Sequence, residues 1–163
     1  MGFGTGLDVP YVQTPAAVVR AMLELARVEP GEMVIDLGCG DGRMALAAVT
    51  DFRARAVGYD LDPERVTEAR ANARRAGLGD RAHFEVSNAL AADISRADVV
   101  VMYLFPPLIE SLTPRFVSEL ATGTRVVSHS FPIRGWKAER TIVAEGRTLY
   151  LYRVPAREPL RLR

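Results

Sequence analysis

The chain has 163 residues and a hydrophobic content of 48%, enough for one domain with its own core and too apolar for a disordered chain. Its net charge of +1 gives no electrostatic case for nucleic acid, so we expect no nucleic-acid partner. Cys39 is the only cysteine, which excludes an internal disulfide, and no apolar run reaches the roughly 18 residues of a membrane span. The N-terminus also lacks a signal-peptide pattern, so the sequence favours a cytoplasmic protein that acts away from membranes.

The sequence divides into a domain and two tails. Residues 1–8 are glycine-rich and are expected to form a flexible tail, and residues 156–163 form a basic tail. The domain occupies residues 9–155, and no linker, repeat or low-complexity segment splits it. The sequence does not fix the oligomeric state, and a monomer is the favoured expectation.

Strand-like and helix-like segments alternate through most of the domain. Thr14 is predicted as the N-cap of a first helix, with Pro15 as its first helical residue. Five strands are predicted from short apolar runs bounded by turn residues: 32–36, 56–60, 82–87, 98–104 and 124–131. Helices follow the first, second and fourth of them, and the last helix, over residues 108–120, is expected to break at Thr113-Pro114.

The end of the domain is predicted as a hairpin. Its strands cover residues 139–144 and 148–154, joined by Glu145-Gly146-Arg147. Strands that alternate with helices build a parallel sheet, and a local hairpin adds an antiparallel strand to it. The predicted fold is therefore α/β, a single Rossmann-like domain with a doubly wound, mostly parallel seven-stranded sheet and an antiparallel C-terminal hairpin strand.

The most informative segment is Asp36-Leu37-Gly38-Cys39-Gly40-Asp41-Gly42, which follows the apolar run of the first strand. Its third glycine comes one residue too early for the dinucleotide pattern G-x-G-x-x-G. A carboxylate before the turn would repel a pyrophosphate, but it would hold an ammonium group. S-adenosylmethionine (SAM) carries an α-ammonium and a sulfonium and has no phosphate, so the segment predicts a SAM site.

Polar residues follow the next two predicted strands. Asp60 ends the second strand, near the spacing of about 20 residues at which a carboxylate meets a ribose diol. Asn88 follows the third strand, where its amide can bind the adenine edge or form an Asx turn before Ala89. The alternative for Asp36 and Asp60 is that both are solvated strand ends.

Four segments together carry a resemblance: Val9–Pro15, Asp36–Arg43, Tyr103–Pro106 and Arg125–Trp136. With them the chain resembles the class I (seven-β-strand) SAM-dependent methyltransferases. More narrowly, it resembles a group of protein lysine methyltransferases that includes archaeal broad-specificity enzymes and the mitochondrial enzymes that modify the ATP synthase c-subunit and the adenine nucleotide translocase. It departs from that group at Gln13, where a proline is usual, and at Asp60, where glutamate is more common.

The resemblance implies SAM as cofactor and S-adenosyl-L-homocysteine as product. It implies that Asp36 holds the methionine ammonium and that Asp60 holds the ribose hydroxyls. Tyr11 and Thr14 would fold over the methionine end, although a hydrophobic staple and a helix cap are their alternative roles. The remaining predicted cofactor residues flank these positions: Gly38, Gly40, Leu61, Asn88 and Ala89.

The acceptor is indicated by the residue before Pro106-Pro107. Methyltransferases that act on planar amides or base amines often carry Asn or Asp there, and Phe105 occupies that place here. No carboxamide or carboxylate is therefore available there, and the resemblance implies a lysine amine of a protein or peptide as acceptor, with a small-molecule acceptor and a non-catalytic SAM-binding module as alternatives. Aromatic residues could line a channel that orients the amine: Tyr103, Phe105, Phe131 and Trp136. For the last two, packing in the core is the favoured alternative.

The two histidines carry weaker signals. His129 lies on the predicted fifth strand, where a satisfied core histidine is favoured over a base. His83 opens the third strand and has no predicted role. With these two distant histidines and one cysteine, the sequence predicts no metal site. The identity of the acceptor and the number of methyl groups transferred stay open.

Overall fold

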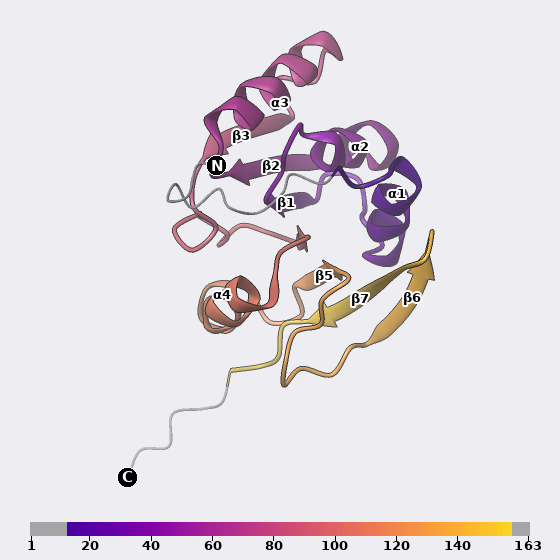
Figure 1. Cartoon of the computed structure of the whole chain (residues 1–163), viewed down its shortest axis with the longest axis vertical. Coiled ribbons are helices and arrows are strands. Elements are labelled where there is room, and N and C mark those ends of the chain that lie inside the picture. The colour runs from indigo at the N-terminus through magenta and orange to yellow at the C-terminus, as the bar shows by residue number, and fades with distance from the viewer. Residues whose placement is uncertain (1–12, 158–163) are drawn as a thin grey trace, which may run out of the picture.

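A computed structural model describes residues 13–157 of the chain, so Tyr11 and the two predicted tails lie wholly or largely outside the described residues. Seven strands form one sheet in the order β3-β2-β1-β4-β5-β7-β6 (Figure 1). The strands are β1 (Met33–Leu37), β2 (Arg55–Asp60), β3 (Ala82–Val86), β4 (Val99–Met102), β5 (Arg125–His129), β6 (Arg140–Ala144) and β7 (Arg147–Arg153). The first five pair in parallel, and β7 runs antiparallel to both of its neighbours. This confirms the predicted α/β sheet.

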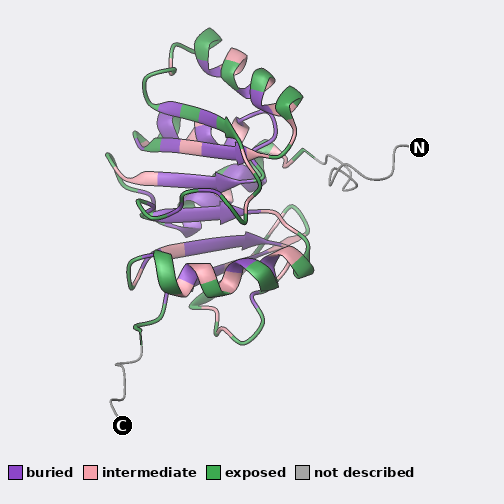
Figure 2. Cartoon of the chain, turned by 90° about the vertical axis from the view of Figure 1, so that its left-hand side faces the viewer, coloured by how far each residue is buried: buried purple, intermediate pink, exposed green. Residues whose placement is uncertain are grey.

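In the described part of the chain, four helices cover the two faces of the sheet: α1 (Ala16–Leu25), α2 (Arg43–Phe52), α3 (Pro63–Arg75) and α4 (Pro106–Glu119). Buried side chains of the first three pack on one face, and those of α4 pack on the other. Figure 2 shows α4 in front of the lower strands of the sheet, with an exposed outer side. The sheet is therefore doubly wound, as predicted.

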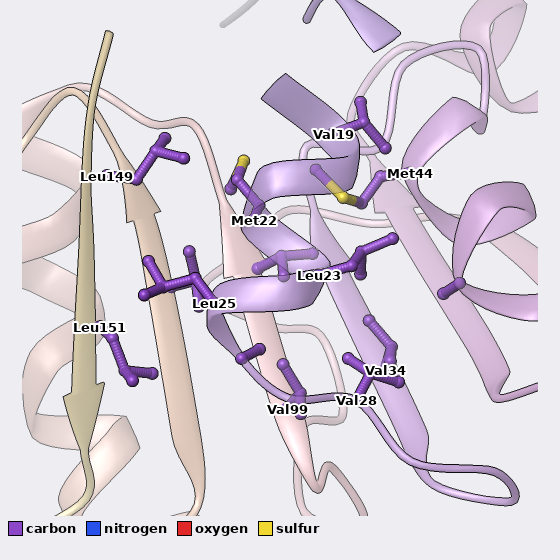
Figure 3. Close-up of a cluster of buried hydrophobic side chains, with 14 of the residues drawn as sticks. Val19, Met22, Leu23, Leu25, Val28, Val34, Met44, Val99, Leu149 and Leu151 are labelled. Carbon is purple, nitrogen blue, oxygen red and sulfur yellow. The ribbon is translucent and has the colours of Figure 1, made fainter. Parts of the chain in front are cut away.

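One of the hydrophobic clusters that form the core is built around α1. Met22, Leu23 and Leu25 of this helix are at most 4% exposed, and they face the strands of the sheet (Figure 3). Among the strand residues that they meet are Val99 and Leu149. Burying one such side chain contributes about 1.5–3 kcal/mol. All four residues of β4 are buried, as expected for a central strand whose two faces are both covered.

The order of the strands also decides where a ligand can bind. From β1 the chain passes through α2 to β2 on one side, whereas β4 pairs with the other side of β1. Ligands of open α/β sheets bind outside the carboxyl ends of the strands at such a reversal. The glycine turn begins at this point, because Gly38 is the first residue after β1.

Two predictions about helices are wrong. Thr14 is not an N-cap, because Pro15 occupies the N-cap position of α1 and no side chain caps the helix. The helix α4 is continuous through Pro114 and begins at Pro106. Pro114 deprives only the carbonyl of Glu110 of its partner, and Glu110 is exposed, so water can replace the lost hydrogen bond.

The hairpin is tighter than predicted. Its turn consists of Glu145 and Gly146, which have φ angles of 49° and 72°, and Arg147 is the first residue of β7. Two residues with positive φ fit a type I′ turn, whose twist matches that of the flanking strands. The shorter turn places Arg147 in the sheet, opposite Ala144.

Candidate cofactor and acceptor site

A pocket of about 420 Å³, counting space open to solvent, lies at the carboxyl ends of β1 and β4. The pocket brings together five of the predicted site residues: Thr14, Asp36, Gly38, Gly40 and Tyr103. These residues come from three different parts of the chain: the segment before α1, the segment from Asp36 to Gly40, and the end of β4.

Asp36 is a buried carboxyl group in the wall of this pocket. Its side chain is 6% exposed, and it has no hydrogen bond or ion pair with any of residues 13–157. Burial, and to a lesser extent the charges of Asp60 and Asp41, raise the pKa of Asp36 to about 7. A buried carboxylate without a partner is costly, and a cation beside it would remove that cost. The residue therefore suits a ligand that carries an ammonium group.

The glycine turn uses its own N–H groups. Those of Gly38 and Cys39 both donate to the carbonyl of Tyr59, at 2.8 and 2.9 Å. The N–H of Gly40 donates to Oδ2 of Asp60 at 2.9 Å. Loops that bind phosphate instead present free N–H groups to the ligand. This arrangement supports the prediction that the turn serves a ligand without phosphate.

Exposed apolar side chains lie at and after the ends of β2 and β3. Leu61, Val86 and Leu90 are 39%, 49% and 41% exposed, which is unusual for large apolar side chains at adjacent strand ends. Asn88 is also exposed, and its Oδ1 accepts a hydrogen bond from the N–H of Leu90 at 2.9 Å. Asn88 therefore forms the Asx turn that was the alternative to adenine binding, and its amide nitrogen stays open. Ala89 is half-buried beside it.

Arg43 joins the segment before α1 to the glycine turn. Its Nη1 donates to the carbonyl of Thr14 at 3.1 Å, and its Nη2 lies 2.6 Å from Oδ2 of Asp41. Burial alone would raise the pKa of Asp41, but the hydrogen bonds and charge of Arg43 hold that pKa below its ordinary value. Since the hydroxyl of Thr14 does not cap α1, it is not committed to the helix. Sequence reasoning missed the role of Arg43.

Three aromatic rings form the predicted acceptor side of the site. Tyr103 follows β4 and stacks on Phe131, with ring centroids 6.2 Å apart. The ring of Phe105 meets Phe131 edge-on at 5.5 Å and is 43% exposed. The cluster therefore runs from the pocket wall at Tyr103 to the exposed ring of Phe105.

Trp136 does not join this cluster. Its ring packs edge-on against Phe116 and Tyr152, at 6.4 and 6.2 Å. Tyr152 pairs with Val126 near the start of β5, away from the edge of the sheet that carries the pocket. The core alternative for Trp136 is thus favoured over a role on the acceptor side.

His129 belongs to the core, as predicted, but it is not a satisfied histidine. The residue is 0% exposed, and its Nδ1 has no hydrogen-bond partner in the described part of the chain. Burial, followed by the charge of Arg147, lowers the pKa of His129 to about 4. The ring is therefore neutral at physiological pH, and it stacks on Tyr103 with centroids 3.9 Å apart.

Other side chains of the pocket were not predicted as site residues. Met22, Met44 and Met102 line it together with Gln13, which the sequence marked only as a departure from the family pattern. The three methionines follow the same apolar periodicity as core residues, so no signal in the sequence could have separated them. Unbranched thioether chains suit a pocket that must adapt to its ligand.

Three features together define a class I SAM-dependent methyltransferase. They are the sheet order with its one antiparallel strand, the buried acid before the glycine turn, and the second acid at the end of β2. The family model for the ANTKMT methyltransferase domain matches residues 36–140, and the chain belongs to this family. Within residues 13–157, no helix combines the length and the apolar character needed to cross a bilayer.

Two curated relatives and one solved structure illustrate the similarity. A protein-lysine N-methyltransferase of Saccharolobus islandicus (strain REY15A) is 47% identical over 149 residues, which cover 88% of this chain and 92% of that protein. The adenine nucleotide translocase lysine N-methyltransferase of Mus musculus is 38% identical over 140 residues, and the match covers 86% of this chain and 60% of that protein. The structure of an RNA methyltransferase from Salinibacter ruber in complex with S-adenosyl-L-homocysteine has a TM-score of 0.88 and 42% identity, and it covers 93% of this chain and 99% of that chain.

Proposed function

We propose that this SAM-dependent methyltransferase transfers methyl groups to the side-chain amine of lysine in protein or peptide substrates. The observation that carries the proposal is Phe105, an exposed aromatic ring at the position before Pro106-Pro107. A ring there cannot hydrogen-bond the NH₂ of a planar amide or a base, but its face can attract an amine. The identity of 47% with a protein-lysine N-methyltransferase supports the same acceptor.

The proposal assigns the cofactor to residues of the pocket and to residues beside it at the ends of β2 and β3. Asp36 would hold its ammonium group and Asp60 its ribose hydroxyls, while Leu61 and Ala89 would border the adenine. Thr14, together with Tyr11, which lies outside the described residues, would cover the methionine end. Bound SAM supplies an electrophilic methyl group on a positively charged sulfur. The carboxyl of Asp36 is buried and has no partner among residues 13–157, so it fits the ammonium group of SAM.

A lysine acceptor must first lose a proton. With a pKa near 10.4, neutralising the amine at pH 7 costs about 4.6 kcal/mol. Holding a nucleophile in line with its target can contribute about 7–11 kcal/mol. Orientation by Tyr103, Phe105 and Phe131 therefore outweighs the cost of deprotonation, and a dedicated base is not required. The pocket wall fits this view, since His129 is enclosed behind Tyr103 and has no atom open for proton exchange.

RNA is the second candidate acceptor, because the Salinibacter ruber relative is an RNA methyltransferase. Phe105 and the net charge of +1 argue against it. A small-molecule acceptor is the third, and a module that binds SAM without turnover is the fourth.

A cytoplasmic location and action as a monomer are further parts of our proposal.

Incubation with tritiated SAM and a cell extract distinguishes the acceptors. We expect label in the protein fraction that resists ribonuclease and is released by protease, with methylated lysine as the labelled amino acid. Label that ribonuclease removes would identify RNA, and label confined to small molecules would reject the lysine proposal. Lys137 is the only lysine of the chain, so Lys137→Arg removes self-labelling of lysine as a source of signal. An Asp36→Asn variant serves as the inactive control.

A further inference from the structure

His129 and Arg147 form a contact that the proposed function does not use. His129 ends β5 and pairs with Leu149, and Arg147 begins β7. Nη1 of Arg147 lies 3.2 Å from Nε2 of His129. A guanidinium group only donates hydrogen bonds, so Nε2 must be the acceptor and the proton of the neutral ring must sit on Nδ1. The contact therefore fixes both the tautomer and the plane of the imidazole.

The buried Nδ1–H group of His129 lowers the free energy of unfolding. The Nδ1–H group of His129 is buried and has no partner among residues 13–157. Leaving a buried donor unsatisfied costs about 1–3 kcal/mol. A phenylalanine ring could fill a similar space in the core without that cost. An unsatisfied polar group in an otherwise apolar environment requires an explanation, and function is one of the common explanations.

A stacking contact of the imidazole ring with Tyr103 provides this explanation. Tyr103 stacks on His129 with centroids 3.9 Å apart and an angle of 21° between the planes. Tyr103 also stacks on Phe131, at 6.2 Å and 14°, and it lines the cofactor pocket. Neither His129 nor Arg147 is among the residues that line the pocket. A fixed imidazole plane would therefore act on the site only through Tyr103.

We propose that His129 and Arg147 are positioning residues for methyl transfer, and that Arg147 orients the imidazole which in turn fixes the ring of Tyr103 at the pocket wall. The pair acts on geometry and does not touch the reacting atoms. Displacements of about 1 Å in such a site can lower a rate up to about a hundredfold. The proposal depends on methyl transfer but not on whether the acceptor is a lysine.

His129→Phe tests the proposal, because it keeps a ring for stacking and removes both the acceptor for Arg147 and the buried N–H. We expect the rate of label transfer to all acceptors in an extract, at saturating SAM, to fall by about tenfold to a hundredfold. Affinity for S-adenosyl-L-homocysteine, measured by calorimetry, should stay within about threefold. The melting temperature should be unchanged or higher, since the unsatisfied donor is gone. A merely structural histidine would instead give a lower melting temperature and an unchanged rate, which would overturn the proposal.

Arg147→Met should give the same loss of rate, and the double variant should be no slower than either single variant, because both substitutions break one contact. Additive losses would contradict a joint role. Arg147→Met also keeps the proposal testable if His129→Phe does not fold. Arg140→Met on the neighbouring strand and His83→Phe on β3 are the matched controls, and both should retain the wild-type rate.

Nitrogen NMR of the histidine rings provides a readout that needs no activity. In His83→Phe protein only His129 contributes a signal, because the chain has two histidines. We expect protonated Nδ1 and unprotonated Nε2, and we expect Arg147→Met to convert this to a mixture of tautomers. A single tautomer in both proteins would show that Arg147 does not orient the ring.

Discussion

Oδ2 of Asp60 accepts a hydrogen bond from the backbone N–H of Gly40 at 2.9 Å, which ties the acid at the end of β2 to the glycine turn after β1. Its Oδ1 accepts a second bond, from the N–H of Asp62, also at 2.9 Å. Each carboxylate oxygen keeps a further lone pair, so Asp60 can hold the turn and accept ligand hydroxyls at the same time. Asp60 thus fixes the glycine turn, and the proposed function adds the ribose hydroxyls of the cofactor as its ligand.

Asp60→Ala should therefore affect both stability and binding. Loss of the acceptor leaves the N–H groups of Gly40 and Asp62 without their partner, and we expect a decrease of about 1–3 kcal/mol in the free energy of unfolding. Affinity for S-adenosyl-L-homocysteine should fall by roughly tenfold to a hundredfold. Chemical denaturation and calorimetry measure the two effects, with the exposed Asp80→Ala as control. Unchanged affinity would remove Asp60 from the site.

Asp36→Asn should abolish cofactor binding and stabilise the unliganded protein. In the folded chain the pKa of Asp36 is about 7, raised from 3.8 in the unfolded chain. Below pH 3.8 both states hold the proton, so the group costs nothing. As pH rises from there through about 7, the unfolded chain loses the proton first, and the folded state loses stability relative to it. Thermal unfolding should show the variant above wild type at pH 8, with the gap closing near pH 4; a lower melting temperature at pH 8 would contradict this.

Cofactor binding should release a proton below neutral pH. An ammonium group favours the ionised form of Asp36, so a ligand that binds there must displace the proton that the raised pKa retains. Affinity for S-adenosyl-L-homocysteine should therefore decrease as pH falls from about 7 to 6. Calorimetry in buffers of different ionisation enthalpy counts the released protons. A pH-independent affinity, with no proton released at pH 6, would separate the ligand from Asp36.

Tyr103→Phe should lower turnover more than it lowers SAM affinity. The substitution keeps the ring that stacks on His129 and Phe131, and it removes only the hydroxyl that can orient an acceptor. Steady-state rates and cofactor titrations of the same protein measure the two effects. Equal turnover in variant and wild type would reduce Tyr103 to a packing residue.

Gly42→Ala should destabilise the fold by more than the strain of its backbone alone. Gly42 has φ of 87°, and a Cβ there would lie 2.8 Å from Cζ of Phe84 and 3.0 Å from the Cβ of Ala69. Gly77 has a similar φ of 72°, but the space around it is open. Denaturation of Gly42→Ala and Gly77→Ala separates the steric cost from the backbone strain, which is of order 1–3 kcal/mol. Equal losses in the two variants would show that Phe84 moves away without cost.

Much of the fold could be predicted because local signals agreed with one another. The acid and glycines of residues 36–42 placed the first strand, the turn and the cofactor edge at once. The predicted break of the last helix at Thr113-Pro114 failed for a reason that a sequence does not contain. Pro114 leaves the carbonyl of Glu110 without its helical partner, and whether water can replace that partner depends on how α4 lies on the sheet.

The acceptor side of the site was harder to predict. Tyr103 and Phe105 follow β4 directly, so their place at the carboxyl edge could be predicted from the sequence. Trp136 lies five residues beyond Phe131 in a loop, and only the packing of that loop turns its ring toward Tyr152. Arg147 was placed in the turn, and its contact with His129 depends on the one-residue difference in the hairpin.

Cys39 lies inside the glycine turn at 5% exposure, and burial raises the pKa of its thiol well above the usual range. Because the thiolate is the reactive form, a closed turn protects this sulfur from alkylating reagents and oxidants. The rate of modification by iodoacetamide would then measure how often the glycine turn opens. Because Cys39 is the only thiol of the chain, all modification by the reagent reports local opening of this turn.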